Sequence, residues 1–259
     1  MQETFYHIPG CPFRIALVSD LHERPFDAVY ESLRRRQPDL ICVAGDFLYG
    51  VLPKNDLKLR EAKQVLPFFA ACAGIAPTFA SIGNHEWLLT PGDAALLAES
   101  GAVLLDNAFR TLRLRDEDVV IGGLSSARFS EYRRLCTAEG SVGFSETANE
   151  ASKFSHAPPE TGWLSDFCAA PGRRILLCHH PEYYPCFLRA LDVDLILSGH
   201  AHGGQIRLFG RGLFAPGQGL LPRLTSGVVD GRLVISRGLA NTVIIPRVFN
   251  PPELVYIEE

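Results

Sequence analysis

The chain has 259 residues, of which 47% are hydrophobic and 21% are charged, and it contains 23 glycines and 18 prolines. This is the composition of an ordinary globular protein with enough apolar residues for a buried core, and no long run of charged residues indicates a disordered tail. The formal net charge of −4 leaves no basic excess, so the composition gives no nucleic-acid signal. The length fits one α/β domain over residues 1–259, or at most two small domains.

The N-terminus and the cysteines bear on where the protein works. The first ten residues, M-Q-E-T-F-Y-H-I-P-G, have neither the basic region nor the apolar run of a signal peptide. No stretch approaches the roughly 18 apolar residues that span a bilayer. Seven cysteines, an odd number without a C-x-x-C pair, favour reduced and mostly buried thiols over disulfides. We therefore expect a cytoplasmic protein, and peripheral contact with a membrane is left open.

The first hundred residues alternate predicted strands and helices. Apolar runs predict buried strands over residues 13–19, 40–44 and 78–82. Helices are predicted from Asp27, a good N-cap, to just before Pro38, and over residues 56–72 with a kink at Pro67. A third helix begins at Pro91 and ends before Gly101. This alternation is typical of a largely parallel sheet.

The second half has a different pattern. Residues 109–115 and 119–122 form a predicted hairpin, and a buried strand lies within residues 191–198. Asp230-Gly231 suits a type I′ turn between two further strands. Residues 253–257 predict a last strand. The polar segment 125–161 is expected to be mostly surface loop, and whether it forms a lid is left open.

Five short motifs share one position, because each follows a predicted strand directly. Ligands of open α/β sheets bind outside the carboxyl ends of the strands, so these motifs are expected to meet at one site. Gly45, Gly83 and Gly199 permit the close backbone turns that such a meeting needs. The motifs are D-x-H, G-D, G-N-H-E, a later histidine and G-H-A-H, with the polar residues Asp20, His22, Asp46, Asn84, His85, His179, His200 and His202.

The chemistry of these side chains predicts a metal site. Imidazole nitrogens, carboxylates and an amide oxygen suit Mn²⁺, Fe²⁺ or Zn²⁺, whereas an all-oxygen set would favour Mg²⁺ or Ca²⁺. Even without His85, these residues offer seven candidate ligands, more than one ion takes from a protein. Two divalent ions are therefore expected, as in hydrolases that activate water for attack on phosphorus.

These motifs, complete and in order from Asp20 to Gln205, resemble the calcineurin-like metallophosphoesterases. The resemblance implies an α/β fold, a four-layer αββα sandwich of two mixed β-sheets flanked by helices. The run G-H-A-H-G-G-Q and the H-H-P run are similar to a bacterial single-domain subgroup. That subgroup includes phosphodiesterases and pyrophosphatases of lipid-linked nucleotides, such as UDP-2,3-diacylglucosamine pyrophosphatases.

The resemblance implies roles for the first group of residues. Asp20, His22 and His202 would hold one metal ion, and Asp46 would bridge this ion to a second. Asp46 would also help to activate the attacking water, and so counts as catalytic together with His85.

The resemblance also implies roles for the other candidates. Asn84, His179 and His200 would hold the second ion. His85 would bind the substrate phosphate and assist the leaving group. Either His179 or His180 could be the ligand in the H-H-P run; His179 is preferred from its distance to the proline, and His180 would then face substrate.

The expected activity is hydrolysis of a phosphodiester or pyrophosphate bond by water activated by two metal ions, with a phosphate-ester small molecule or lipid-linked nucleotide as substrate. A phosphoprotein phosphatase is the alternative enzyme, and a non-catalytic scaffold of the same fold is the alternative without activity. Apolar residues of the segment 209–221 either line a groove for an acyl chain or pack on the core. The sequence does not indicate the native metals or the oligomeric state.

Overall fold

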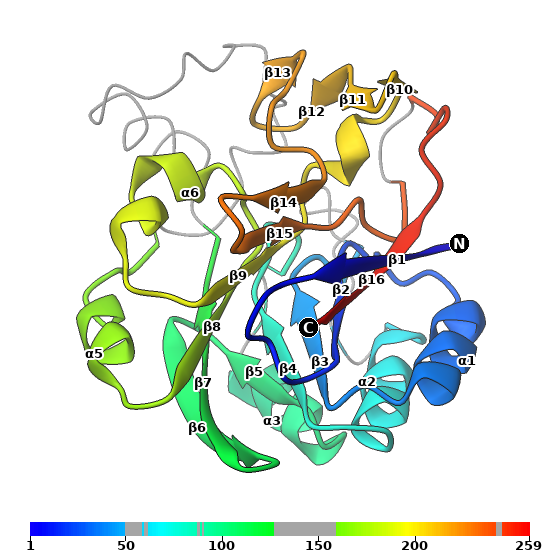
Figure 1. The fold of residues 1–259 in the computed structure, drawn as a ribbon. Helices are drawn as coiled ribbons and strands as arrows, with labels where there is room; N and C mark the ends of the chain where they lie inside the picture. Colours follow the sequence, from blue (N-terminus) through cyan, green and yellow to red (C-terminus); the bar gives the residue numbers. More distant parts are fainter. Residues whose placement is uncertain (50–58, 60–61, 87–88, 90, 127–158, 242–244) are drawn as a thin grey trace.

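The structure is a computed structural model that describes residues 1–49, 59, 62–86, 89, 91–126, 159–241 and 245–259. Two six-stranded sheets form its centre, and short helices lie on their outer faces (Figure 1). Within these residues no helix is long and apolar enough to cross a membrane.

The first sheet has the strand order β1-β16-β2-β3-β4-β5. From β2 to β5 the strands are parallel, whereas β16 is antiparallel to β2 and parallel to β1. Its strands are β1 (Gln2–His7), β2 (Ile15–Val18), β3 (Leu40–Ala44), β4 (Thr78–Ser81), β5 (Val103–Leu105) and β16 (Glu253–Glu258).

The second sheet has the order β14-β15-β9-β8-β7-β6 and is parallel from β15 to β7, with an antiparallel strand at each edge. Its strands are β6 (Ala108–Leu114), β7 (Glu117–Leu124), β8 (Arg173–Cys178), β9 (Leu195–Ser198), β14 (Gly227–Val229) and β15 (Leu233–Ile235). Beyond β9 lie two small hairpins, β10 (Arg207–Leu208) with β11 (Arg211–Gly212) and β12 (Phe214–Ala215) with β13 (Gly219–Leu220).

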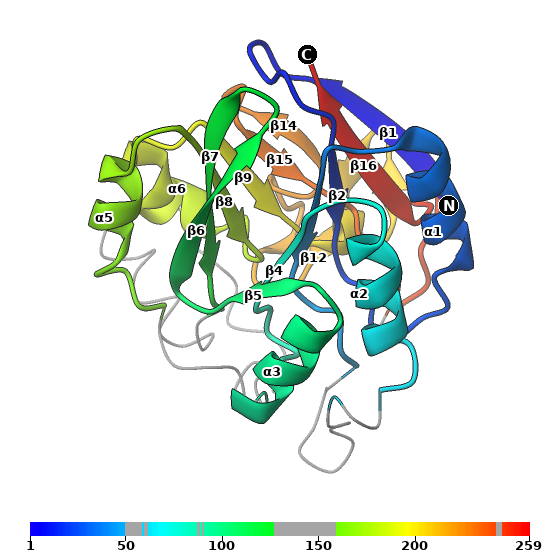
Figure 2. The same cartoon turned by 90° about the horizontal axis from the view of Figure 1, so that it is seen from below.

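The layers follow from the two faces of each strand. In β2, Ile15 and Leu17 face the second sheet in one buried cluster, whereas Ala16 and Val18 face helices in another. Both faces are therefore apolar, which is why the strands appear as continuous apolar runs. Figure 2 shows α1, α2 and α3 beside the first sheet and α5 and α6 beside the second. This confirms the four-layer αββα arrangement of two mixed sheets.

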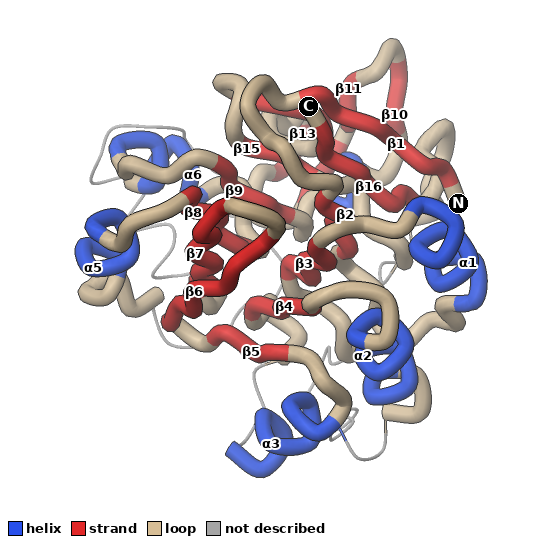
Figure 3. The backbone as a smooth tube through the Cα atoms, turned by 60° about the horizontal axis from the view of Figure 1, so that its bottom comes forward, coloured by secondary structure: helices blue, strands red, loops and turns tan. Residues whose placement is uncertain are grey.

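The helices are α1 (Asp27–Arg36), α2 (Val65–Ala73), α3 (Pro91–Glu99), α5 (Leu164–Ala169) and α6 (Tyr183–Cys186), and Figure 3 shows how they flank the sheets. Two expectations need correction. Phe26, not Asp27, occupies the N-cap of α1, and Asp27 lies in the first turn, where its charge suits the helix dipole. Helix α2 begins only at Val65, so Pro67 lies in its first turn. Proline is tolerated there, because the N–H groups of the first turn have no partner within the helix, and no kink results.

The hairpin predictions are confirmed. Strands β6 and β7 pair antiparallel, and Asp230 and Gly231 both have positive φ between β14 and β15, as a type I′ turn requires. Strand β1 and helix α5 were not predicted. Most of the segment 125–161 lies outside the described residues, so the lid hypothesis is not addressed.

The cysteines largely agree with expectation. Cys11, Cys42, Cys72 and Cys178 are buried free thiols, and Cys168 is free and half-buried. Cys186 is disulfide-bonded, so the prediction of reduced thiols is wrong at this position. The residues next to a cysteine in the sequence do not show which distant cysteine the fold brings beside it, so this bond could not be predicted.

Candidate metal centre

The predicted site residues lie at the carboxyl ends of strands from both sheets. In the first sheet, the loops after β2 and β3 continue the pairing of their strands. The backbone N–H of Asp20 donates to Gly45 O at 3.2 Å, and that of His22 donates to Asp46 O at 3.1 Å. Asn84 and His85 follow β4, the next strand of the same sheet. Neighbouring strands therefore bring the first three motifs together.

The second sheet supplies the other histidines from adjacent strands. His179 follows β8, and His200 and His202 follow β9. The N–H of Gly199 donates to His179 O at 3.1 Å, and the N–H of His200 donates to Asp20 Oδ1 at 3.2 Å. The second of these bonds joins the two sheets at the site.

Close backbone packing at the site depends on glycine. Gly45 has φ +75°, and a Cβ there would lie 2.7 Å from the backbone of Gly83. At Gly199 a Cβ would lie 2.6 Å from Ser19 Cβ and 2.7 Å from Asp20 Oδ2. A side chain at either position would push the metal-facing loops apart.

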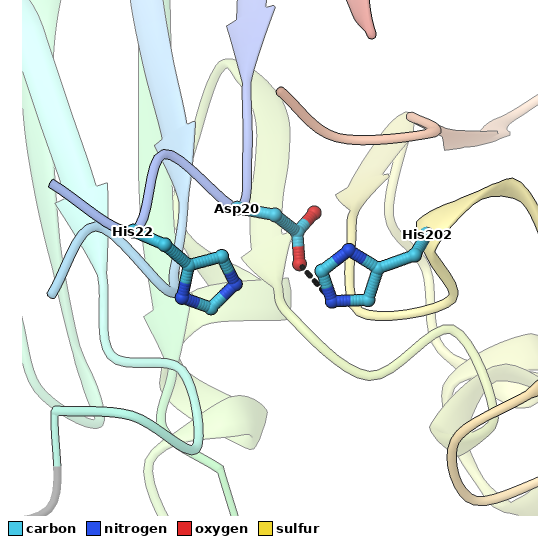
Figure 4. A group of neighbouring side chains, drawn as sticks. All are labelled: Asp20, His22 and His202. Atoms are coloured by element: carbon cyan, nitrogen blue, oxygen red, sulfur yellow. Dashed lines mark ion pairs between the residues drawn. The ribbon is translucent and has the colours of Figure 1, made fainter. Parts of the chain in front are cut away.

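One group of possible ligands consists of Asp20, His22 and His202, whose ligand atoms lie within 4.8 Å of one another. Figure 4 shows the two imidazoles on either side of the Asp20 carboxylate, and His202 Nε2 lies 3.6 Å from Asp20 Oδ1. His22 Nδ1 lies 3.1 Å from Leu48 O, and a carbonyl only accepts. The proton of a neutral His22 is therefore on Nδ1, which leaves the Nε2 lone pair facing the site.

A second group consists of Asp46, His179 and His200. His179 Nδ1 donates to Ala44 O at 2.7 Å, so its Nε2 also faces the site. This nitrogen lies 3.0 Å from Asp46 Oδ2 and 3.2 Å from Asn84 Oδ1. One imidazole nitrogen thus has a carboxylate oxygen and an amide oxygen as near neighbours.

Asp46, a member of the second group, also lies beside His22 of the first. Its Oδ2 is 3.8 Å from His22 Nε2 on one side and 3.0 Å from His179 Nε2 on the other. Its Oδ1 accepts from the backbone N–H of His85 at 3.0 Å, and His85 Nε2 lies 3.7 Å from Oδ2. The carboxylate therefore contacts residues of both groups.

The histidines differ in their access to solvent. The side chains of His22 and His179 are fully buried, whereas His85 and His180 keep 11% and 10% of their side-chain surface exposed. His180 points away from Asp46, with its Nδ1 3.7 Å from Glu182 Oε2. The two histidines expected to face substrate are thus the more accessible ones.

At His22, His200 and Asp46 the electrostatics favour the protonation states that bind metals. Burial, reinforced by neighbouring imidazoles, lowers the pKa of His22 and His200 well below its usual value, so both are neutral at pH 7. Burial alone would raise the pKa of Asp46, but the surrounding imidazoles, His179 foremost, hold it well below its usual range. His179 differs, because the Asp46 carboxylate outweighs the effect of burial and raises its pKa to about 9. Without a bound cation His179 therefore carries a proton at pH 7, which a metal ion would displace from Nε2.

Divalent metal ions fit this set of residues. Asp20 Oδ2 and His22 Nε2 are buried atoms with no hydrogen-bond partner among the described residues. Buried polar atoms of native proteins are almost always satisfied, so such atoms indicate a missing binding partner. Neutral imidazoles and carboxylates are the ligand forms that a divalent cation requires.

The calcineurin-like phosphoesterase family model matches residues 13–204, about three quarters of the chain. The chain belongs to this family. The match covers every motif of the site, from the D-x-H after β2 to the G-H-A-H after β9.

Named relatives of this phosphoesterase include two bacterial enzymes. It is 26% identical over 212 residues to phosphodiesterase YaeI of Escherichia coli, covering 79% of this chain and 66% of that protein. It is 25% identical over 300 residues to UDP-2,3-diacylglucosamine pyrophosphatase LpxG of Chlamydia muridarum, covering 98% of this chain and 85% of that protein. These relatives support a hydrolase of phosphate esters or anhydrides.

A solved structure supports the fold. The crystal structure of a dimetal phosphatase from Danio rerio matches with a TM-score of 0.51 at 12% identity, over 88% of each chain. This similarity agrees with two mixed sheets flanked by helices.

Glu86, in the G-N-H-E motif, is a site residue to which the sequence gave no role. Its buried carboxylate accepts the backbone N–H groups of Gly83 at 2.7 Å and of Asp46 and Leu48 at 2.9 Å each. Burial, together with the charge of Asp46, raises the pKa of Glu86 to about 8. Glu86 therefore ties the loop after β4 to the loop after β3.

Glu182 and Arg247 were also missed. Glu182 is buried and accepts from Gln218 Nε2 at 2.8 Å, which links the end of β8 to the β12–β13 hairpin. Arg247 Nη2 lies 3.2 Å from His202 Nδ1. The position of Glu182, two residues after the H-H pair, was a signal by which it could have been identified. Nothing in the sequence indicated that Arg247 lies beside His202.

Proposed function

We propose that the protein hydrolyses a phosphodiester or pyrophosphate bond with the help of two divalent metal ions of the Mn, Fe or Zn type. The observation that carries this proposal is the position of Asp46, whose carboxylate contacts both groups of buried possible ligands. Two such ions would lower the pKa of water and neutralise charge on the phosphoryl oxygens.

Each ligand group would hold one ion. Asp20, His22 and His202 would take the first, and Asp46 would be shared. The convergence of His179 Nε2 with oxygens of Asp46 and Asn84 supports their place at the second ion.

His200 and His180 complete the second half of the site. His200 belongs to the group that contains Asp46 and His179 and would bind the second ion. His179 is preferred as the ligand over His180, because its Nε2 faces Asp46 whereas His180 Nδ1 faces Glu182. His180, which is partly accessible, would contact substrate.

His85 would act on the substrate rather than on the metals. Its backbone N–H bond to Asp46 fixes the loop, and its ring is the most exposed imidazole of the cluster. A ring in this place can hydrogen-bond a phosphoryl oxygen and donate a proton to the leaving oxygen.

The substrate is proposed from the relatives. One is named a phosphodiesterase and the other a pyrophosphatase of UDP-2,3-diacylglucosamine, a lipid-linked nucleotide. We propose a substrate with a phosphodiester or a pyrophosphate bond, and we favour a lipid-linked nucleotide. We also propose that residues 1–259 form one domain. The buried cluster that joins both sheets supports the single domain.

The experiment is metal analysis of the purified protein, followed by hydrolysis of bis-p-nitrophenyl phosphate and p-nitrophenyl phosphate. About two Mn, Fe or Zn ions per chain and preference for the diester support the proposal. Preference for the monoester would favour the phosphoprotein phosphatase, and absence of both metal and hydrolysis after reconstitution would favour a scaffold. His180→Ala is the matched comparison for His179→Ala: only the His179 variant is expected to lose metal.

A further inference from the structure

A set of large apolar side chains lies exposed next to the metal centre. We name it the apolar rim and define it as Leu208, Phe209, Leu220, Leu221, Val248 and Phe249. Phe209 is fully exposed, and Leu220, Leu221 and Phe249 each expose 74% or more of their surface. A soluble protein scatters such residues singly, so a cluster of them indicates an interaction surface.

Backbone hydrogen bonds place the parts of the rim side by side. The N–H of Arg207 donates to Val248 O at 3.0 Å, which sets the segment before β16 beside β10. Leu213 donates to Ile206 O at 2.8 Å, and Leu221 donates to Leu213 O at 2.9 Å. Figure 1 shows the β10–β13 hairpins together at one end of the molecule, with the orange-red segment before β16 beside β10.

The backbone of the rim is strained in a way that exposes its side chains. Phe209 and Gly210 have φ of +51° and +79° at the tip of the β10–β11 hairpin. These are the positions of a type I′ turn, where Asn-Gly is the usual pair. Leu221 and Phe249 also have positive φ. A bulky residue in this conformation costs about 1–2 kcal/mol, yet these three side chains bury little within the chain.

The charge around the rim is basic. Residues 195–229 contain no Asp or Glu, although the whole chain has a net charge of −4. Two arginines of this stretch are exposed: Arg211, the first residue of β11, and Arg223, two residues after Leu221. Exposed aromatic and aliphatic side chains among arginines suit a surface with an apolar interior and anionic headgroups. A second copy docked by two-fold symmetry would instead bring the same arginines together.

The rim is connected directly to the metal centre. His202 begins the short helix His202–Gly204, which leads into β10. Arg207 Nη1 donates to Gly203 O at 2.8 Å, and Leu213 N donates to Gly204 O at 3.2 Å. A surface bound by the rim would therefore lie close to the proposed ligand His202.

We propose that the apolar rim docks the protein on an anionic lipid bilayer, with Phe209 and Phe249 entering the headgroup region and Arg211 and Arg223 contacting lipid phosphates. This goes beyond the proposed function and does not require it. The sequence left two roles open for the apolar residues of the segment 209–221, lining a groove or packing on the core. The exposed side chains of Phe209, Leu220 and Leu221 do neither.

The test is co-sedimentation with vesicles of phosphatidylcholine alone and of phosphatidylcholine with phosphatidylglycerol. The wild-type protein is expected to partition at least about tenfold better to the anionic vesicles, and less well at high salt. The double variant Phe209→Ser/Phe249→Ser should lose at least about tenfold in partitioning, because two buried aromatic contacts are lost. Val228→Ser, also apolar and exposed but outside the rim, is the control.

A second pair of variants tests the charge. Arg211→Gln/Arg223→Gln should reduce binding to the anionic vesicles and its salt dependence, whereas Arg34→Gln, on α1, should change neither. All variants should keep the far-ultraviolet circular dichroism spectrum, so that loss of binding is not loss of fold. Equal binding of the wild type and the Phe209/Phe249 variant would overturn the proposal. So would a wild-type dimer that this variant disperses, without vesicle binding by either.

Discussion

The metal centre and the apolar rim both hold non-glycine residues at positive φ, but their side chains go to opposite places. Asp46 and His202, at φ +54° and +45°, direct buried side chains toward the other ligands. Phe209 and Phe249, at +51° and +52°, direct theirs into solvent. In the centre, contacts within the chain offset the strain. In the rim both side chains are mostly exposed, so contacts among the described residues offset little of the strain. This difference is the reason to look for a binding partner outside the chain.

The largest expected effect is at the residue shared by the two ligand groups. Asp46→Asn should lower metal content at both sites and reduce diester hydrolysis by about 10⁴-fold or more, because a neutral amide is a weaker ligand. Metal analysis and kinetics measure the two effects together. Unchanged metal content would contradict the bridging role of Asp46.

His85→Ala should separate chemistry from metal binding. We expect kcat to fall by about 10²–10⁴-fold, because a proton donor to the leaving group is lost, while metal content stays at the wild-type level. The measurement is kcat on a diester with a poor leaving group, with metal analysis of the same sample. Full activity on that substrate would refute the role given to His85.

Gly45→Ala tests how tightly the centre is packed. Its φ of +75° and a new Cβ only 2.7 Å from the Gly83 backbone should lower the free energy of unfolding by about 3 kcal/mol. Gly231→Ala is the matched control, since Gly231 has φ +70° but no neighbour within 4 Å. The control should lose only about 1 kcal/mol. Equal losses in urea unfolding would show that close packing at Gly45 adds nothing.

The smallest expected effect is a gain in stability rather than a loss. Phe209→Asn should raise the free energy of unfolding by about 0.5–1 kcal/mol, because Asn tolerates positive φ, and should weaken vesicle binding at the same time. Leu208→Asn, at a neighbouring position without positive φ, should weaken vesicle binding without the gain in stability. Urea unfolding and co-sedimentation measure the two effects. A Phe209→Asn variant that is less stable than wild type would mean that Phe209 is not strained.

Regular local patterns allowed much of the fold to be predicted. Strand β3 was predicted at its observed ends, because both of its faces are buried and its apolar run is uninterrupted. The Asp230-Gly231 turn was predictable because few residues accept positive φ at both centres. Strand β1 was not, because its sequence Q-E-T-F-Y-H is half polar and only pairing with β16 makes it a strand.

The candidate site divides in the same way. Asp20, Asp46 and His200 were recognised because each directly follows an apolar strand, and ligands bind at the carboxyl ends of strands. That His200 reaches the site from the second sheet was decided by how the two sheets pack. The contact of Arg247 with His202 joins residues 45 positions apart through a loop without a motif. The sequence also could not predict which imidazole nitrogen faces the site. Hydrogen bonds to backbone carbonyls such as Leu48 O and Ala44 O decide this.

The sequence by itself determined the strand–helix alternation of the first hundred residues, the ligand types and the family resemblance, because these depend on side-chain chemistry and local periodicity. Tertiary structure alone decided that Glu86 ties two loops together and that Arg247 contacts His202. It also decided that Phe209 and Phe249 share an exposed rim beside the site. These facts depend on how segments distant along the chain pack against one another, and packing is set by the free energy of the whole fold rather than by any local pattern.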